Sequence, residues 1–298
     1  MILTESHSPL VSIVMPTYNQ AKYLPVSVQS VLDQTFTNWE LIIVDNFSTD
    51  NTLEVLSEFS DARIKLLQIN NKGCIGKSRN LAIKSAKSEW LAFLDSDDSW
   101  EPNKLEVVRG HLHEEIDFLY HNLTVVDADM HELKSIQIRS RKLKSPIVKD
   151  LVLNGNTIAT SSVVVRRSVV LNVGGMSEET ELIGIEDYNT WLRISVNTEK
   201  FKLIPTFLGS YRKHNSNHTT FEDFRPPLAA IEEFLHLLSS VEMDQLNKSF
   251  EYLKVRTKFL NKNFKNLRVN LVSVIRTGTC IQKLKALSML MVMLVTLN

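Results

Sequence analysis

Features typical of secreted and membrane proteins are scarce in this sequence of 298 residues. Its two cysteines, Cys74 and Cys280, are too few for a disulfide framework, which indicates a reducing compartment. The first residues contain no cationic segment and no small-residue cleavage site, so we expect no signal peptide. No stretch reaches the roughly 18 apolar residues of a spanning helix, and the nearest, residues 286–297, is shorter. A cytoplasmic globular protein is therefore expected.

Glycine and proline are also scarce, with nine and eight residues respectively, which excludes collagen-like and linker-rich chains. The 43% of apolar and 23% of charged residues are ordinary for a globular protein and exclude a disordered one. The length predicts one large domain or two of ordinary size.

Acidic residues are missing from the C-terminal end of the chain. Residues 252–298 contain nine Lys or Arg and no Asp or Glu, whereas residues 1–251 contain 25 basic and 34 acidic residues. The net charge of zero therefore combines a basic end with an acidic body. Because the composition changes near Pro226-Pro227, we predict one domain over 1–225 and a mainly helical basic region over 226–298.

Strand and helix patterns alternate over the first part of the chain. An apolar run rich in β-branched residues predicts a strand at 10–15, and further apolar runs predict strands at 39–44, 64–69 and 90–94. Helical periodicity predicts helices at 23–33, 52–59, 78–86 and 103–113. This alternation predicts an α/β fold with a mostly parallel sheet and helices on both faces.

The pattern loosens after residue 118. Strands are expected at 118–126, 132–138, 162–165 and 201–211. Short helices are expected at 147–153 and 186–196, and the residues beyond Pro227 are expected to be helical.

Small polar clusters follow each of the first four predicted strands. They occupy residues 16–19, 45–52, 70–73 with Arg79-Asn80, and 95–98. Ligands bind at the carboxyl ends of the strands in such a sheet, so the four clusters predict one site.

The acidic cluster Asp95-Ser-Asp97-Asp98 directly follows a buried strand. Alternate carboxylates at a strand end suit a hard divalent cation that also binds phosphate and water. An acidic cap of the following helix is the competing interpretation, and the motif alone does not decide between them.

Other ligand-binding motifs are incomplete. The segment 73–78 imitates a phosphate-binding loop but has Asn71 where that motif has glycine, and no G-x-G-x-x-G follows the first strand. The His111-x-His113 pair lies on a charged helix and is expected to be a solvated surface.

Six ordered motifs over residues 10–215 resemble an inverting family 2 glycosyltransferase with the GT-A fold, a Rossmann-like fold, of the type that builds bacterial surface polysaccharides. The motifs are VMPTYN (14–19), VDNFSTDNT (44–52), NKGCIGKSRN (71–80), FLDSDD (93–98), GGM (174–176) with Glu186-Asp187, and YRKH (211–214). The family usually has Ala before Arg-Asn, whereas this chain has Ser78.

The resemblance implies a role for each matching residue. Thr17 and Tyr18 would border the nucleobase of the donor, and Asp45 and Arg79 would hydrogen-bond its edge. The full set of donor-binding residues implied is Pro16, Thr17, Tyr18, Asn19, Asp45, Asn46, Lys72, Gly73, Arg79, Asp95 and Ser96. The metal, Mn²⁺ or Mg²⁺, would be held by Asp97, Asp95 and His214.

The resemblance also implies the reaction. Asp187, with Glu186 beside it, would take a proton from an acceptor hydroxyl as general base while the metal stabilises the leaving diphosphate. The sugar would pass from a nucleotide donor, expected to be a UDP-sugar, to a saccharide or lipid-linked acceptor with inversion. From spacing alone, Glu186-Asp187 also fits an acidic helix N-terminus. A catalytically inactive sugar-nucleotide binding module or membrane scaffold is the alternative function.

The basic region after residue 251 interleaves Lys and Arg with apolar residues. Such a stretch can dock on an anionic membrane, here the inner face of the cell membrane, or can pack as a helical bundle or homodimer contact. Nucleic acid is not expected as a partner, because the body is acidic and no aromatic stacking platform accompanies the basic residues.

Overall fold

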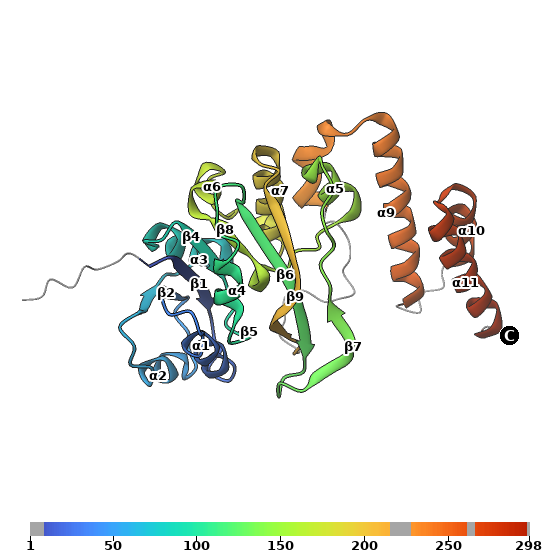
Figure 1. The fold of residues 1–298 in the computed structure, drawn as a ribbon. Coiled ribbons are helices and arrows are strands. Elements are labelled where there is room, and N and C mark those ends of the chain that lie inside the picture. Colours follow the sequence, from blue (N-terminus) through green and yellow to red (C-terminus); the bar gives the residue numbers. More distant parts are fainter. Residues whose placement is uncertain (1–8, 215–227, 261–265, 297–298) are drawn as a thin grey trace, which may run out of the picture. The chain divides into compact units, whose positions relative to one another are not determined.

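The computed structural model describes residues 9–214, 228–260 and 266–296, without the side chains of residue 281 and residues 293–296. The chain divides into two compact units (Figure 1). The first consists of Met1–Val148 and Asn156–His218, and the second of Lys149–Gly155 and Thr219–Asn298. The predicted boundary at Pro226-Pro227 lies outside the described residues.

The described residues contain nine strands in one sheet. They are β1 (Val11–Thr17), β2 (Trp39–Asp45), β3 (Ile64–Gln68), β4 (Trp90–Phe93), β5 (Ser99–Trp100), β6 (Phe118–Val126), β7 (Glu132–Ile138), β8 (Val164–Arg166) and β9 (Phe201–Arg212). Their order is β3-β2-β1-β4-β8-β6-β9-β5, and β7 pairs with β6.

The helices of the first unit lie between these strands along the chain, although no helix separates β4 from β5 or β6 from β7. They are α1 (Leu24–Leu32), α2 (Thr52–Ser57), α3 (Ile75–Ser85), α4 (Lys104–Arg109), α6 (Arg167–Asn172) and α7 (Glu186–Asn197), with 3₁₀ turns η1 (Thr160–Ser162) and η2 (Thr180–Leu182). The helix α5 (Ile147–Asn154) crosses from one unit to the other.

The first half of the sheet is parallel, as the strand–helix alternation predicts. β1 pairs with β2 and β4, and β2 pairs with β3, all in parallel register. Every residue of β1 and β4 is buried. Such continuously buried runs are typical of parallel strands covered on both faces.

The second half of the sheet is mixed, although most paired residues of the whole sheet lie in parallel pairings, as predicted. β8 lies antiparallel to both β4 and β6, β7 is antiparallel to β6, and β5 is antiparallel to β9, whereas β6 and β9 are parallel. Antiparallel neighbours can be joined by a short turn, as β6 and β7 are, so the strand–helix alternation ends here.

Helices cover both faces of the parallel half, as expected. On one face α1 and α4 pack on alternate residues of β1, β2 and β4, where Ile13, Leu41 and Ala92 are fully buried. On the other face α3 contacts β1 and β2. There, Trp191 of α7 meets the rings of Phe93 and Phe118 edge to face. This packing holds the carboxyl ends of the strands in place.

Several element boundaries differ from the sequence prediction. α3 begins at Ile75 rather than Ser78, and α4 ends at Arg109, directly before Gly110. The short elements α6 and β5 were not predicted, and β5, with two residues, is too short to show a period.

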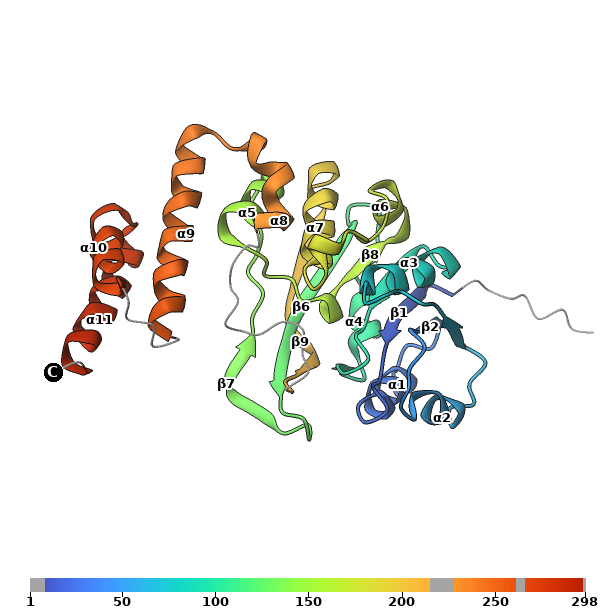
Figure 2. The same cartoon turned by 180° about the vertical axis from the view of Figure 1, so that it is seen from behind.

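The second unit is helical, as predicted. Beyond α5 it contains α8 (Leu228–Ile231), η3 (Glu232–Leu237), α9 (Ser240–Leu260), α10 (Leu267–Thr277) and α11 (Cys280–Thr296) (Figure 2). Val255, Leu271 and Ala286 form a small core between the last three helices. In the part of the chain that the structure describes, no helix is both long and apolar enough to cross a membrane.

Candidate active site

The polar clusters meet at one edge of the sheet, as predicted. Thr17, the last residue of β1, is in register with Asp45, the last residue of β2. The amide of Leu94, just after β4, donates to the carbonyl of Val14 in β1 at 3.1 Å. The carboxyl ends of the three strands therefore lie side by side.

Asp45 organises the loop after β2. Its carboxylate is buried and accepts hydrogen bonds from the Ser48 hydroxyl (2.5 Å) and from Gln68 Nε2 (3.1 Å). Asn46 Oδ1 accepts from the amide of Asn71 (2.8 Å), which joins this loop to the next one. These contacts fix two of the predicted donor-binding residues against the sheet.

The loop after β1 is tied to the same segment. Asn19 has a positive φ of 51°, which asparagine tolerates better than most residues. Its Oδ1 accepts from the amide of Thr49 at 2.8 Å. Pro16 and Thr17 are buried, whereas Tyr18 is 51% exposed. Phe47 is 55% exposed and was not among the predicted site residues, although an aromatic side chain within a polar strand-end cluster is a visible signal.

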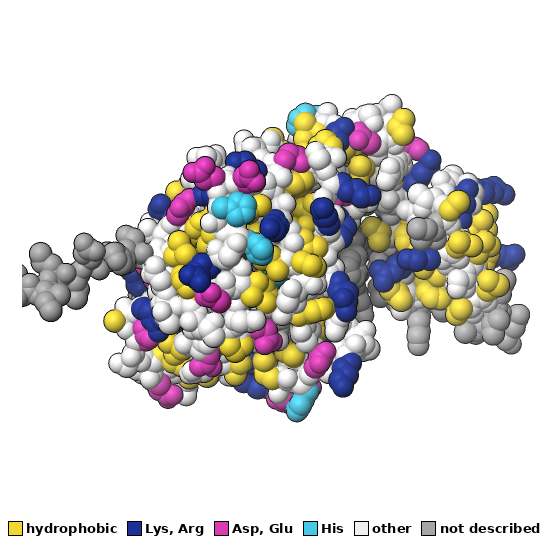
Figure 3. All heavy atoms as spheres, in the orientation of Figure 1, with side chains coloured by type: hydrophobic (Ala, Val, Ile, Leu, Met, Phe, Trp, Pro, Cys, Tyr) yellow, Lys and Arg dark blue, Asp and Glu magenta, His cyan; other side chains and the backbone are white. Residues whose placement is uncertain are grey.

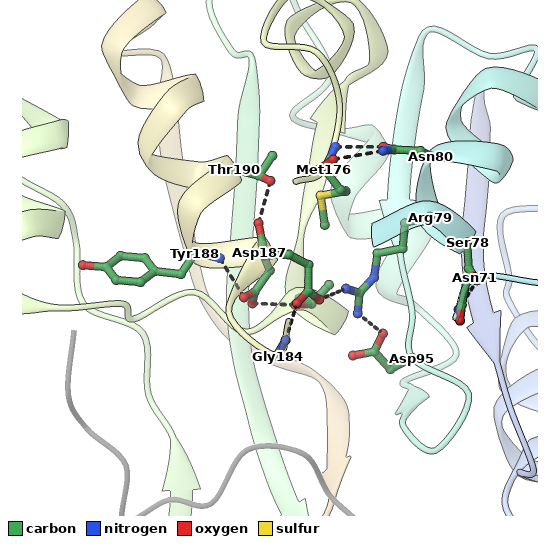
Figure 4. A network of polar contacts seen from close by, with 12 residues as sticks. Asn71, Ser78, Arg79, Asn80, Asp95, Met176, Gly184, Asp187, Tyr188 and Thr190 are labelled. Carbon is green, nitrogen blue, oxygen red and sulfur yellow. Dashed lines mark hydrogen bonds and ion pairs between the residues drawn. The ribbon is translucent and has the colours of Figure 1, made fainter. Parts of the chain in front are cut away.

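The segment 71–80 connects this edge to the segment that follows α6. Lys72 and Gly73 form a turn with φ of 53° and 84°. The side chain of Asn80 accepts from the amide of Met176 (2.8 Å) and donates to its carbonyl (2.9 Å), as Figure 4 shows. Residues nearly a hundred positions apart are thus held together beside the site.

Arg79 links two acidic segments from different parts of the chain. Its guanidinium is buried and donates to Asp95 Oδ1 (2.6 Å) and Glu186 Oε1 (2.5 Å) (Figure 4). Desolvation by burial lowers the pKa of Arg79, but the negative charges of Asp95 and Glu186 outweigh it and hold this pKa above its ordinary value. Both terminal nitrogens of Arg79 are therefore occupied by these two carboxylates. The motif at 71–80 does not by itself predict the contact with Glu186.

Asp187 lies at the start of α7, next to Glu186. Its Oδ2 accepts from the Thr160 hydroxyl (2.8 Å) and its Oδ1 from the amide of Tyr188 (2.6 Å). Burial raises the pKa of Asp187 to about 6, and the negative charge of Glu186 adds to this rise. A carboxylate with a pKa near neutrality is suited to accept a proton.

The loop after β4 is anchored by its last carboxylate. Asp98 is buried and accepts from the Ser161 hydroxyl (2.5 Å) and the amide of Arg212 (3.0 Å). Burial, followed by the charges of Asp97 and Asp95, raises the pKa of Asp98 well above its usual range. The carbonyl of Ser96, which is buried, accepts from Ser27 of α1 at 2.8 Å.

Asp97 and His214 are in contact at the end of β9. His214 Nε2 lies 2.9 Å from Asp97 Oδ2, and the imidazole stacks on the ring of Tyr23 with centroids 4.5 Å apart. Carboxylate and imidazole side chains this close are a donor set that Mn²⁺ accepts. Among the described residues, no group of three or more His, Cys, Asp or Glu is arranged to hold a metal ion.

The comparison with known proteins identifies the family. The family model described as glycosyl transferase family 2 matches residues 12–174, more than half of the chain. The chain belongs to glycosyl transferase family 2. The family match contains the first four motifs, whereas Asp187 and His214 lie beyond it.

Curated glycosyltransferases share extended sequence similarity with the chain. The uncharacterized glycosyltransferase MJ1057 of Methanocaldococcus jannaschii is 30% identical over 220 residues, 72% of this chain and 74% of that protein. The Escherichia coli UDP-Glc:alpha-D-GlcNAc-diphosphoundecaprenol beta-1,3-glucosyltransferase WfgD is 48% identical over 120 residues, which is 40% of this chain but only 47% of WfgD.

Solved structures of glycosyltransferases share the fold. S. aureus TarS 1–349 in complex with UDP-GlcNAc superposes with a TM-score of 0.65 at 21% identity, covering 90% of this chain and 81% of that one. The mannosyltransferase PcManGT from Pyrobaculum calidifontis, in complex with GDP-Man and Mn²⁺, gives a TM-score of 0.60 at 14% identity, covering 95% and 80%. The predicted GT-A fold and family are thus confirmed, and the roles of single residues stay predictions.

Proposed function

We propose that this glycosyltransferase transfers a sugar, with inversion, from a UDP-sugar to a hydroxyl of a lipid-linked or polysaccharide acceptor. One observation carries the proposal: Arg79 joins the strand-end loop at Asp95 to the start of α7 at Glu186. The carboxylate beside it, Asp187, therefore lies next to the loop of the predicted donor site. The names of WfgD and of the TarS complex support a UDP-sugar.

Asp187 is the general base in this proposal. Its pKa of about 6 leaves most of the side chain ionised at pH 7, so that it accepts the proton of the attacking hydroxyl. Such a proton transfer typically contributes about 10²–10⁴-fold to the rate. Arg79 keeps Glu186 ion-paired, so that the two adjacent carboxylates on α7 have different environments.

A divalent metal fits the side chains at the end of β4 and β9. Asp97 and His214 would hold it, with Asp95 close by, and the remaining ligands would be oxygens of the donor diphosphate and water. When bound, such an ion neutralises charge on the leaving diphosphate. The chain's own contribution is to hold His214 in place by the stacking on Tyr23.

The donor nucleotide would lie over the ends of β1 and β2. Tyr18 offers an exposed ring for the base, and the buried Asp45 carboxylate offers acceptors for N–H or O–H groups of the nucleoside. The loops that contain Asn19, Asn46, Lys72 and Gly73 are joined by hydrogen bonds at this edge, and the carbonyl of Ser96 is bonded to Ser27 of α1.

Release of nucleoside diphosphate from a panel of nucleotide-sugars with Mn²⁺ tests the function. We expect release from a UDP-sugar that increases when a lipid-diphosphate sugar acceptor is added. Asp187→Asn is expected to lower transfer by about 10²–10⁴-fold while leaving the donor dissociation constant unchanged. Donor binding without release by the wild-type protein would support the inactive binding module instead.

We also propose that the second unit docks on an anionic membrane, where a lipid-linked acceptor would be found. Helix α11 uses Ala286, Met289 and Leu290 in the core, yet Leu284 (68% exposed) and Met291 (62% exposed) lie on its other side. In Figure 3 the side chains over α10 and α11 are basic, apolar or uncharged. An apolar helix face beside Lys and Arg fits the headgroup region of anionic lipids.

A further inference from the structure

The turn η1 contains three consecutive hydroxyl residues that are all buried. Thr160, Ser161 and Ser162 are between 0% and 8% exposed. Buried hydroxyls are normally hydrogen-bonded. The partner of each hydroxyl therefore identifies the group that this turn keeps in position. The Ser162 hydroxyl donates to the carbonyl of Ala159, directly before the turn, at 2.6 Å, and it has no other partner among the described residues. The hydroxyls of Thr160 and Ser161 instead donate to Asp187 and Asp98.

Thr160 holds the proposed base. Its hydroxyl donates to Asp187 Oδ2 at 2.8 Å, and the amide of Tyr188 donates to Oδ1 at 2.6 Å. A carboxylate has about four lone-pair positions, of which these two bonds use one on each oxygen. The two bonds therefore fix the plane of the carboxylate and leave acceptor positions for a substrate hydroxyl.

Ser161 holds the loop of the proposed donor site. Its hydroxyl donates to Asp98 Oδ2 (2.5 Å) and accepts from the amide of Asp95 (3.1 Å). Its carbonyl accepts from Trp100 Nε1 (2.9 Å) and from the buried Lys104 Nζ (3.3 Å). One residue thus contacts the backbone amide of the first aspartate of the cluster, the carboxylate of the last one, and two side chains beyond the cluster.

We propose that Thr160 and Ser161 are positioning residues that set the distance and orientation of the base relative to the donor-site loop. This rests on the proposed function of Asp187 and of the Asp95–Asp98 loop. Consecutive Cα atoms are 3.8 Å apart, so two neighbouring residues in a packed turn form a short and rigid link. A small displacement of a general base from its productive position lowers the reaction rate by a large factor. A rigid link that prevents this displacement therefore supports catalysis.

The pair Thr160→Val and Thr160→Ser isolates the hydroxyl of Thr160. Valine keeps the shape and loses the bond, so we expect kcat about tenfold lower, with the donor KM within about twofold of wild type. Because the lost bond favoured the ionised carboxylate, the acidic limb of the pH profile should move up by about one unit. Serine restores the hydroxyl and should restore both values.

The variants Ser161→Ala and Ser162→Ala together test whether the Ser161 hydroxyl positions the donor-site loop. Ser161→Ala releases Asp98 and the amide of Asp95, so we expect a donor KM about tenfold higher with the acidic limb of the pH profile unchanged. Ser162→Ala removes an equally buried hydroxyl from the same turn and should stay within about twofold of wild type in both constants.

Two results would overturn the proposal. One is a Thr160→Ser protein as impaired as Thr160→Val, since the hydroxyl would then be irrelevant. The other is an unshifted pH profile in Thr160→Val. Titration of the Asp187 carboxyl carbon by NMR, in wild type and Thr160→Val, reads the same shift without turnover. A wild-type protein that transfers no sugar while this shift is present would refute the proposed function alone.

Discussion

At the scale of single residues, several acidic side chains of the site surround the buried Arg79. Asp95, Glu186 and Asp187 all act on the charge of Arg79. Buried carboxylates lose the solvation of water, so each needs a partner or a raised pKa. Glu186 has a partner in Arg79, and Asp187 has a raised pKa.

Arg79→Met is expected to destabilise the folded protein by about 3–5 kcal/mol, because it leaves Asp95 and Glu186 without their buried partner. Urea unfolding measures the change. Arg109→Met is the matched control, since its pair with Glu106 is about half exposed and is expected to contribute at most about 1 kcal/mol. Equal losses for both variants would show that burial does not govern the Arg79 contacts.

Asp187→Asn is expected to stabilise the protein above pH 6, by up to about 3 kcal/mol. The folded pKa of about 6 lies above the usual value of 3.8, so the folded state binds the proton more tightly and loses stability as pH rises between these values. The advantage of the variant should vanish below about pH 4. Melting temperatures at pH 4, 6 and 8 test this.

Asp61→Asn provides a control of opposite sign. The Arg63 side chain lowers the pKa of Asp61 through a hydrogen bond, so ionisation of this carboxyl favours the folded state. Its replacement should therefore lower the melting temperature at neutral pH, and the loss should disappear as pH falls below the folded pKa. Parallel pH trends in the two variants would contradict our account of Asp187.

At the scale of elements, the segment after α6 is locked to α3 by a glycine. Gly175 has a φ of 84°, and a Cβ there would lie 2.5 Å from Asn80 Oδ1. That Asn80 side chain bonds both backbone groups of Met176. The absence of a side chain at residue 175 thus allows α3 and this segment to meet.

Gly175→Ala is expected to cost about 2–4 kcal/mol more than Gly174→Ala, because it also displaces the Asn80 hydrogen bonds. Gly174 has a φ of 82° and open space around a Cβ, so its substitution reports the conformational cost alone, about 1–2 kcal/mol. Differential unfolding measurements compare the two. If both variants lose the same stability, the close approach of Asn80 is unimportant.

At the scale of the whole molecule, the charge is divided along the chain. Residues 252–298 carry nine basic and no acidic residues. On α9, Lys248 and Lys254 pair with Asp244 and Glu251. Helices α10 and α11 contain no acidic residue, and no ion pair of their Lys or Arg residues is found within the described part of the chain. The positive charge of these two helices is therefore available to anionic partners.

Lys283→Gln with Lys285→Gln is expected to weaken binding to phosphatidylglycerol vesicles about 30-fold, at about 1 kcal/mol per basic residue. Lys248→Gln with Lys254→Gln is the control and should have little effect, because those charges are already paired. Vesicle sedimentation measures both. The membrane proposal would be wrong if the wild-type protein did not bind the vesicles and had twice the mass of one chain in solution. The exposed face of α11 would then be interpreted as a homodimer contact.

The sequence by itself determined the fold class and the edge of the sheet where the site lies. Apolar runs and helical periods locate β1–β4 and α1–α3, since residues within such an element are close in the chain. Polar residues after buried strands must then gather at one edge, which places Asp45, Asp95 and Asp97 together.

Only the tertiary structure decided which side chains meet. The Arg79–Glu186 pair, the Thr160–Asp187 bond and the stacking of His214 on Tyr23 join residues from 27 to nearly 200 positions apart. These contacts depend on how β6, β8 and β9 return to the sheet with mixed directions, and local periodicity carries no information about that return. Long-range packing therefore completes a site that local patterns can only locate.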